Sequence, residues 1–211
     1  MDNLIWLLVL VMTVAIVVSL LGVFLRSPSF KGKMGEAAVH SRLDRELDGK
    51  TYTEFHDLII PSRNGTTQID HVYISKYGIF VVETKNYTGW IFGSEKQARW
   101  TQVVYKEKHY FQNPLRQNYA HIKALAALLN LPDSKFHSLA VFLGDCEFKT
   151  EMPPNVCRLR SAAEYIESFQ TALLDEGQIQ AAVAVLSSDE YRADKEKLRE
   201  HTVRLRERHR H

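Results

Sequence analysis

The chain has 211 residues, with 27 basic and 25 acidic side chains and a formal net charge of +2. This length allows one ordinary domain with an appendage. Because the charges nearly balance, any binding of nucleic acid has to come from a local patch. The two cysteines, Cys146 and Cys157, are too few for a disulfide framework and lack the spacing of a zinc site. The sequence contains no glycine-rich phosphate loop, nucleophile elbow or His-Glu-x-x-His motif.

The first part of the chain is strongly apolar. No charged residue lies between Leu4 and Leu25, and a helix of about 22 residues is long enough to cross a bilayer core of about 30 Å. A cleavable signal peptide would have a basic start and a shorter apolar core. We therefore predict a single transmembrane anchor over residues 1–26, which contacts the bilayer through residues 4–25.

Basic residues follow the apolar span. They are Arg26, Lys31 and Lys33. The positive-inside rule places this flank in the cytoplasm, so we predict a single-pass protein of the cell membrane with its N-terminus outside and its catalytic domain cytoplasmic. A short linker is predicted over 27–33, because Pro28 disfavours a helical conformation at Ser27.

An amphipathic helix is predicted from Met34 to about Leu47, with apolar residues spaced four apart from Val39 onward. Glu36 lies one turn before Val39 on the same stripe, so it faces the core side of the helix. Two roles are open for it. A glutamate in a first turn complements the helix dipole, and a glutamate near a metal site adds a carboxylate or orients water.

A β-hairpin is predicted within residues 67–85, where two β-rich runs flank a turn containing glycine. Glu83 and Lys85 share one face because side chains alternate along a strand. A four-residue loop would place Asp70 opposite Glu83, and a two-residue loop would place it opposite Lys85. Either register gathers two carboxylates and an ammonium group, which together can hold a divalent cation against a phosphodiester.

The setting of these charges matters. Residues 79–82 are all apolar, which suits a central strand covered on both faces. Charged side chains are rarely buried unless they are paired or bound to a metal. The charged triad therefore indicates either a ligand site or a buried network of ion pairs.

A second antiparallel pair is predicted over 90–93 and 99–105, followed by a strand at 109–111. Its mixed aromatic and basic residues suit either base stacking or ordinary packing of a sheet face. Asn113 and Pro114 then begin a helix as N-cap and first residue. Gln117 falls in its first turn, where it would orient water, bind a phosphate backbone or remain a solvated amide.

The remaining segments complete one domain. Strands are predicted at 138–144 and 155–159, helices follow, and a charged helix or tail fills 187–211. The order helix, three strands, helix, strand indicates an α/β fold with a mixed sheet flanked by helices. We place this domain at 34–186, after the membrane anchor.

Several blocks of the sequence together resemble the nuclease-related domain (NERD) family of the PD-(D/E)xK restriction-endonuclease-like group. They are Lys33-Met34-Gly35-Glu36, Gln68-Ile69-Asp70-His71, Gly78 to Tyr87, Gly89, Trp100 and Asn113 to Asn118. The resemblance covers the middle half of the chain, residues 33–131, and implies a restriction-endonuclease-like core. One departure is Ile69, which stands where the group's name has proline.

The resemblance implies Asp70, Glu83 and Lys85 as the signature catalytic residues, with Glu36 and Gln117 in support. Lys85 would position the attacking water or stabilise negative charge that develops on the phosphate.

Asp70 and Glu83 would be ligands of Mg²⁺ or Mn²⁺, and the resemblance adds the Thr84 carbonyl. We therefore predict a membrane-anchored, metal-dependent nuclease, with DNA as the favoured nucleic-acid partner by analogy. The alternatives are an inactive nucleic-acid-binding module on the same fold and an interaction scaffold that binds no nucleic acid.

Overall fold

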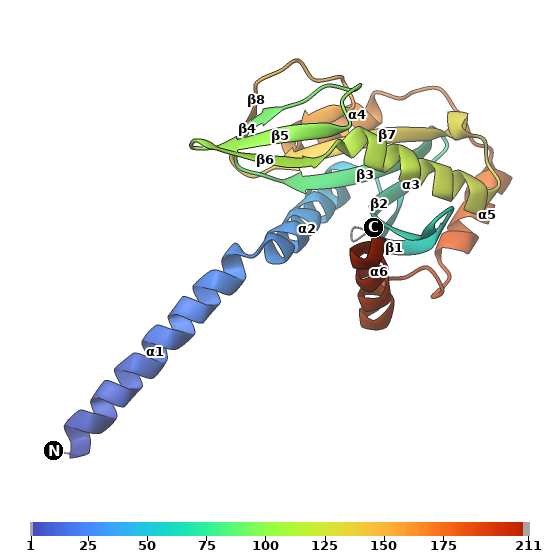
Figure 1. Cartoon of the computed structure of the whole chain (residues 1–211). Coiled ribbons are helices and arrows are strands. Elements are labelled where there is room, and N and C mark those ends of the chain that lie inside the picture. The colour runs from blue at the N-terminus through green and yellow to red at the C-terminus, as the bar shows by residue number, and fades with distance from the viewer. Residues whose placement is uncertain (1, 209–211) are drawn as a thin grey trace.

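The computed structural model describes residues 2–208 of the chain (Figure 1). Met1 of the predicted anchor and residues 209–211 of the predicted tail lie outside the described residues. Two mixed sheets are flanked by helices, which confirms the predicted α/β class.

The main sheet has five strands within residues 2–208, in the order β1-β2-β3-β7-β9. β1 and β2 pair antiparallel, as do β2 and β3, whereas β3–β7 and β7–β9 are parallel pairs. Helix α3 lies between β3 and β7 in the chain and makes the crossover that a parallel pair requires. The strands are β1 (Thr53–Ser62), β2 (Gly65–Ser75), β3 (Gly78–Asn86), β7 (Phe136–Leu143) and β9 (Val156–Arg158).

A smaller four-stranded sheet, also within the described part of the chain, has the order β6-β5-β4-β8. Its core is Trp100, which is fully buried and stacks on Phe142 of the main sheet with ring centroids 5.9 Å apart. The predicted second antiparallel pair corresponds to β4 and β5. The strands are β4 (Gly89–Phe92), β5 (Arg99–Val104), β6 (Glu107–Gln112) and β8 (Cys146–Phe148).

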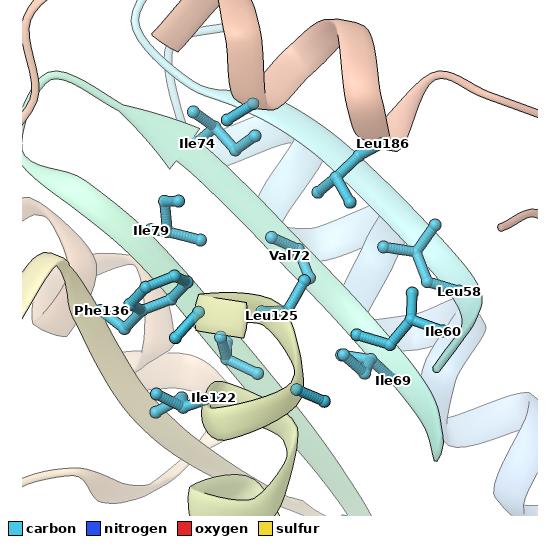
Figure 2. Close-up of a cluster of buried hydrophobic side chains, with 14 of the residues drawn as sticks. Leu58, Ile60, Ile69, Val72, Ile74, Ile79, Ile122, Leu125, Phe136 and Leu186 are labelled. Atoms are coloured by element: carbon cyan, nitrogen blue, oxygen red, sulfur yellow. The ribbon is translucent and has the colours of Figure 1, made fainter. Parts of the chain in front are cut away.

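Helices cover both faces of the main sheet. On one face, α3 (Pro114–Leu129) and α5 (Glu176–Leu186) pack on apolar side chains of β1 and β2, among them Ile60, Ile69 and Val72 (Figure 2). On the other face, α2 (Pro28–Glu46) and α4 (Ala162–Glu167) pack around Phe80 and Leu139. Because β3 is buried on both sides, its charged residues lie in a largely dry environment.

The segment 27–33, predicted as a linker, is instead the start of α2. Pro28 is the first helical residue, where a proline loses no hydrogen bond, and the Ser27 hydroxyl accepts a hydrogen bond from Phe30 N at 3.3 Å. The prediction was wrong because it used the effect of proline on the preceding residue and overlooked its place at a helix start.

Helix α1 (Asp2–Arg26) extends away from the rest of the molecule (Figure 1). Among the described residues, no single helix satisfies the length and hydropathy required of a membrane span. Those requirements are met only when Leu10–Leu25 and Ser29–Glu46 are taken together across a bend of 60°.

The C-terminal segment folds back onto the domain. Ile59 N donates to Tyr191 O at 2.8 Å, and Ala193 N donates to Asp57 O at 2.9 Å. These bonds fasten residues 191–193 to the outer edge of β1, and helix α6 (Lys195–Arg208) follows directly.

Candidate functional site

The catalytic hairpin predicted from sequence is formed by β2 and β3. Its register pairs Ser75 with Gly78 and His71 with Val82. This register is the one expected for a four-residue loop, in which Asp70 lies opposite Glu83. Because Ser75 and Gly78 also pair, only residues 76 and 77 remain in the turn. The ladder stops at His71, so Asp70 lies just past the point where the two strands separate. There, Asp70 Oδ2 accepts a hydrogen bond from the backbone N–H of Thr84 at 2.8 Å.

Glu83 and Lys85 lie on β3 at the same end. The Glu83 carboxylate is buried, at 2% exposure, and its Oε1 accepts a hydrogen bond from Lys85 Nζ at 2.5 Å. Burial alone would lower the pKa of Lys85, but the charge and hydrogen bond of Glu83, together with the charge of Asp70, raise it. The ammonium group is therefore charged at neutral pH and oriented by Glu83.

Gln117 reaches the same group from α3. Its Oε1 accepts a second hydrogen bond from Lys85 Nζ at 3.1 Å. The position of the helix start is set by Asn113, whose side chain accepts from Leu115 N at 2.9 Å. Asn118, one residue beyond Gln117, is fully buried and donates to Val81 O at 2.7 Å. Gln117, predicted from sequence as a supporting residue, therefore contacts Lys85, and its suggested contact with water or a phosphate backbone stays a prediction.

Glu36 approaches from α2 on the other side of the sheet. Close packing of the helix on β3 is possible because Gly35 has no side chain, and a Cβ there would come within 2.9 Å of Asn86 Cβ. Asn86 Nδ2 also donates to Lys31 O at 2.7 Å. Burial, then repulsion from Asp57 and Glu83, raises the pKa of Glu36 above its usual value. Glu36 therefore belongs to the same electrostatic cluster as Glu83.

The carboxylates of the cluster repel one another. Burial raises the pKa of Asp70 well above its usual range, and the negative charges of Glu83 and Glu36 add to the shift. Glu83 Oε2 is buried without a hydrogen-bond partner among the described residues. A buried oxygen of this kind is costly unless something satisfies it.

The donor set fits a hard divalent cation. Mg²⁺ commonly takes one or two carboxylates and keeps several waters, and here the Asp70 and Glu83 carboxylates flank the strand separation. In the described part of the chain, no group of three or more His, Cys, Asp or Glu side chains is placed to hold a metal. A site built on protein oxygens would thus rest on these two carboxylates, with Thr84 contributing its carbonyl as the resemblance implies.

Two cavities open at this cluster. The larger, of about 1080 Å³, lies between α3, the β1–β2 turn and α6, and is lined by Glu36, Gln68, Asp70 and Gln117 among others. The second, of about 620 Å³, lies toward α2 and also contacts Glu36, Gln68 and Asp70. Glu36, Asp70 and Gln117 are therefore open to molecules of substrate size, whereas Glu83 and Lys85 line neither of these two cavities.

Two histidines that were not among the predicted site residues lie near the cluster. His121 Nδ1 lies 3.6 Å from Glu83 Oε2, and burial lowers the pKa of His121. A signal existed, since His121 follows Gln117 by one helical turn, but a structural role was the simpler interpretation. His201 of α6 lines the larger cavity, and no spacing in the sequence indicated that contact.

The middle of the chain is similar to known proteins. A model of the nuclease-related domain (NERD) family matches residues 31–143. An uncharacterized protein of Bacillus anthracis is 42% identical over 160 residues, which cover 72% of this chain and 74% of that protein. No solved structure matches the chain. The family match contains all six predicted site residues, namely Glu36, Asp70, Glu83, Thr84, Lys85 and Gln117.

Proposed function

The chain belongs to the nuclease-related domain (NERD) family, and from this premise we propose that it is a metal-dependent nuclease of the PD-(D/E)xK type. The substrate is a phosphodiester, with DNA favoured. The observation that carries the proposal is the convergence of Asp70, Glu83 and Lys85 where β2 and β3 separate, beside an open cavity.

Each residue has a role that follows from its contacts. Asp70 and Glu83 would hold a divalent cation, Mg²⁺ or Mn²⁺. When bound, such a cation neutralises charge on the phosphoryl group and lowers the pKa of a coordinated water. Lys85 is held by Glu83 and Gln117, which supports a role in which its ammonium stabilises the developing negative charge.

Glu36 and Gln117 act as supporting residues. The pKa of Glu36 is raised. Glu36 can therefore exchange a proton with water at a pH nearer to neutral than an ordinary glutamate can. Gln117 limits the motion of the Lys85 side chain by its 3.1 Å hydrogen bond. An arrangement in which the reactive groups are held in advance reduces the reorganisation needed in the transition state.

Cleavage of labelled DNA and RNA tests the proposal directly. The full-length protein, purified in detergent, should cut DNA in Mg²⁺ or Mn²⁺ and lose all cleavage in excess chelator. A protein that binds DNA but shows no cleavage with either metal would be the inactive binding module instead. A protein that neither binds nor cuts either nucleic acid would be a scaffold.

We also propose that α1 anchors the nuclease in the cell membrane. Two observations support this: residues 4–25 carry no charge, and apolar side chains of α1 are exposed, with Trp6 at 72% and Val23 at 69%. Transferring such surface into lipid would be favourable by about 25 cal/mol per Å² of apolar area.

Protease treatment of intact cells tests the orientation. Because basic residues follow the apolar segment, the nuclease domain should lie in the cytoplasm and resist external protease. Moving Arg26, Lys31 and Lys33 to positions before Leu4 should weaken or invert this orientation. Digestion of the unmodified domain from outside would contradict the assignment.

A further inference from the structure

Helix α6 lies where the two cavities of the catalytic cluster meet. His201 faces the larger cavity, whereas Leu198 and Thr202 line the smaller one. Both cavities contact Glu36 and Asp70. The two spaces are therefore neighbours that share the catalytic carboxylates, and α6 lies along the boundary between them.

The contact of α6 with the sheet is unusual for so polar a helix. Most of its described side chains are exposed, yet His201 is only 8% exposed. The His201 Nδ1 atom lies 2.9 Å from the Thr66 hydroxyl oxygen on β2, a contact that joins residues 135 positions apart. His201 also lies close enough to influence the pKa of His121, which neighbours Glu83. A helix that was merely solvated would not bury a histidine beside the catalytic cluster.

The connection of α6 to the domain resembles a hinge. Residues 191–193 are fixed to β1 by backbone hydrogen bonds, and Lys197 Nζ caps the carbonyls of Asp189 and Glu190 at 2.9 and 2.8 Å. The start of α6 is thus fixed to the domain. Farther along the helix, the side-chain contact between His201 and Thr66 holds α6 against β2. Weak side-chain contacts can break while the backbone attachment holds.

The charges around the cavities suit a phosphate backbone. Arg63 and Lys123 line the larger cavity, and Lys33 lines the smaller. Glu36 and Asp70 line both cavities and so are shared by the two sets of basic groups. A nucleic-acid strand that crossed the cluster would meet basic groups on either side of the reacting phosphate.

We propose that the two cavities are the halves of one nucleic-acid channel centred on Asp70, and that α6 is a movable bar seated across it. The substrate strand displaces α6 from β2 when it lies across the catalytic cluster. This inference rests on the proposed function, because it takes the ligand to be nucleic acid. It adds a path for the strand and a closed state of the free protein.

Hydrogen exchange of the backbone amides of residues 195–208 measures whether α6 is held against β2 or displaced from it. In the full-length protein without metal, these amides should be protected, and a saturating short DNA duplex should increase their exchange. Unchanged or slower exchange with the duplex bound would overturn the proposal, because α6 would then be a fixed wall of the site.

Two variants provide an independent readout through duplex affinity. Thr66→Val removes a hydrogen bond that seats the bar, so duplex should bind about threefold to tenfold more tightly. The matched control, Thr53→Val, makes the same change at an exposed position at the start of β1 and should leave affinity unchanged. A chain truncated after Asp194 should bind at least as tightly as the full chain. Weaker binding by both the Thr66 variant and the truncated chain would contradict the proposal.

Cleavage in Mg²⁺ separates this inference from the proposed function. If duplex opens α6 but no form of the protein cleaves, the channel stands and the nuclease assignment fails. If the protein cleaves while α6 stays protected, the nuclease assignment stands and the movable bar is wrong. If neither the full nor the truncated chain binds duplex, and neither cleaves DNA or RNA, both proposals fail.

Discussion

Replacing Asp70 with asparagine should abolish metal-dependent cleavage and at the same time raise the melting temperature of the metal-free protein. Loss of a metal ligand should reduce kcat/KM by about 10³-fold or more. In the metal-free fold, burial and the charges of Glu83 and Glu36 disfavour ionised Asp70. Asparagine removes that charge and keeps an oxygen for Thr84 N, so stability should rise, by about 2–4 °C for each kcal/mol gained.

The dependence of this gain on pH has a definite sign. The folded-state pKa of Asp70 is raised above its unfolded value, so the aspartate protein is most stable when this group is protonated and loses stability as the pH rises through the folded pKa. The advantage of asparagine should therefore be greatest at neutral and higher pH and vanish in acid. Differential scanning calorimetry of both proteins across pH measures it.

Asp48 provides a matched control for this substitution. Hydrogen bonds from Lys50 N and the Thr51 hydroxyl lower the pKa of its exposed carboxyl. Asp48→Asn should therefore not stabilise the protein. If Asp70→Asn instead lowers the melting temperature without metal, the cluster is a structural network of ion pairs and not a metal centre.

Replacing Lys85 with alanine should cost cleavage and stability together, yet leave metal binding intact. Without its ammonium group, kcat should fall by about 10²–10³-fold. Glu83 would remain as an unpaired buried charge, which costs about 3–5 kcal/mol. A divalent cation should restore much of this stability, because it neutralises the same carboxylate. Thermal unfolding with Mg²⁺ and with chelator measures both effects.

A second Glu-x-Lys pair in the chain serves as the control. Lys149 Nζ lies 2.6 Å from Glu147 Oε1, but both side chains are more exposed than those of the first pair, at 31% for Lys149 and 63% for Glu147. Lys149→Ala should therefore change stability by no more than about 1 kcal/mol and leave cleavage unaffected. If Lys85→Ala and Lys149→Ala changed stability and cleavage equally, burial would give the Glu83–Lys85 pair no special role.

Much of the fold was predictable because periodicity reports on burial. The continuous apolar run before Glu83 identified a strand covered on both faces, and β3 is that strand. Asn113 and Pro114 located the start of α3, and with it the place of Gln117 in the first helical turn. These features depend on residues that are close together in the chain, so a single sequence is enough to predict them.

Other features depend on contacts between distant segments. The exact end of the β2–β3 ladder leaves Asp70 free to accept from Thr84 N, and hairpin rules gave two registers without deciding between them. The seat of His201 on Thr66 joins the charged C-terminal helix to the site. Sequence alone predicted a charged helix or tail there, since nothing local distinguishes a histidine that docks from one that faces water.

The location of bound Mn²⁺ tests most directly the claim that Asp70 and Glu83 form a metal centre. In crystals of the full-length protein soaked with Mn²⁺, anomalous scattering should place the ion between these two carboxylates, and crystals of the Glu83→Gln variant should lack that peak. Mn²⁺ bound only elsewhere, or a peak of equal strength in the variant, would contradict the account.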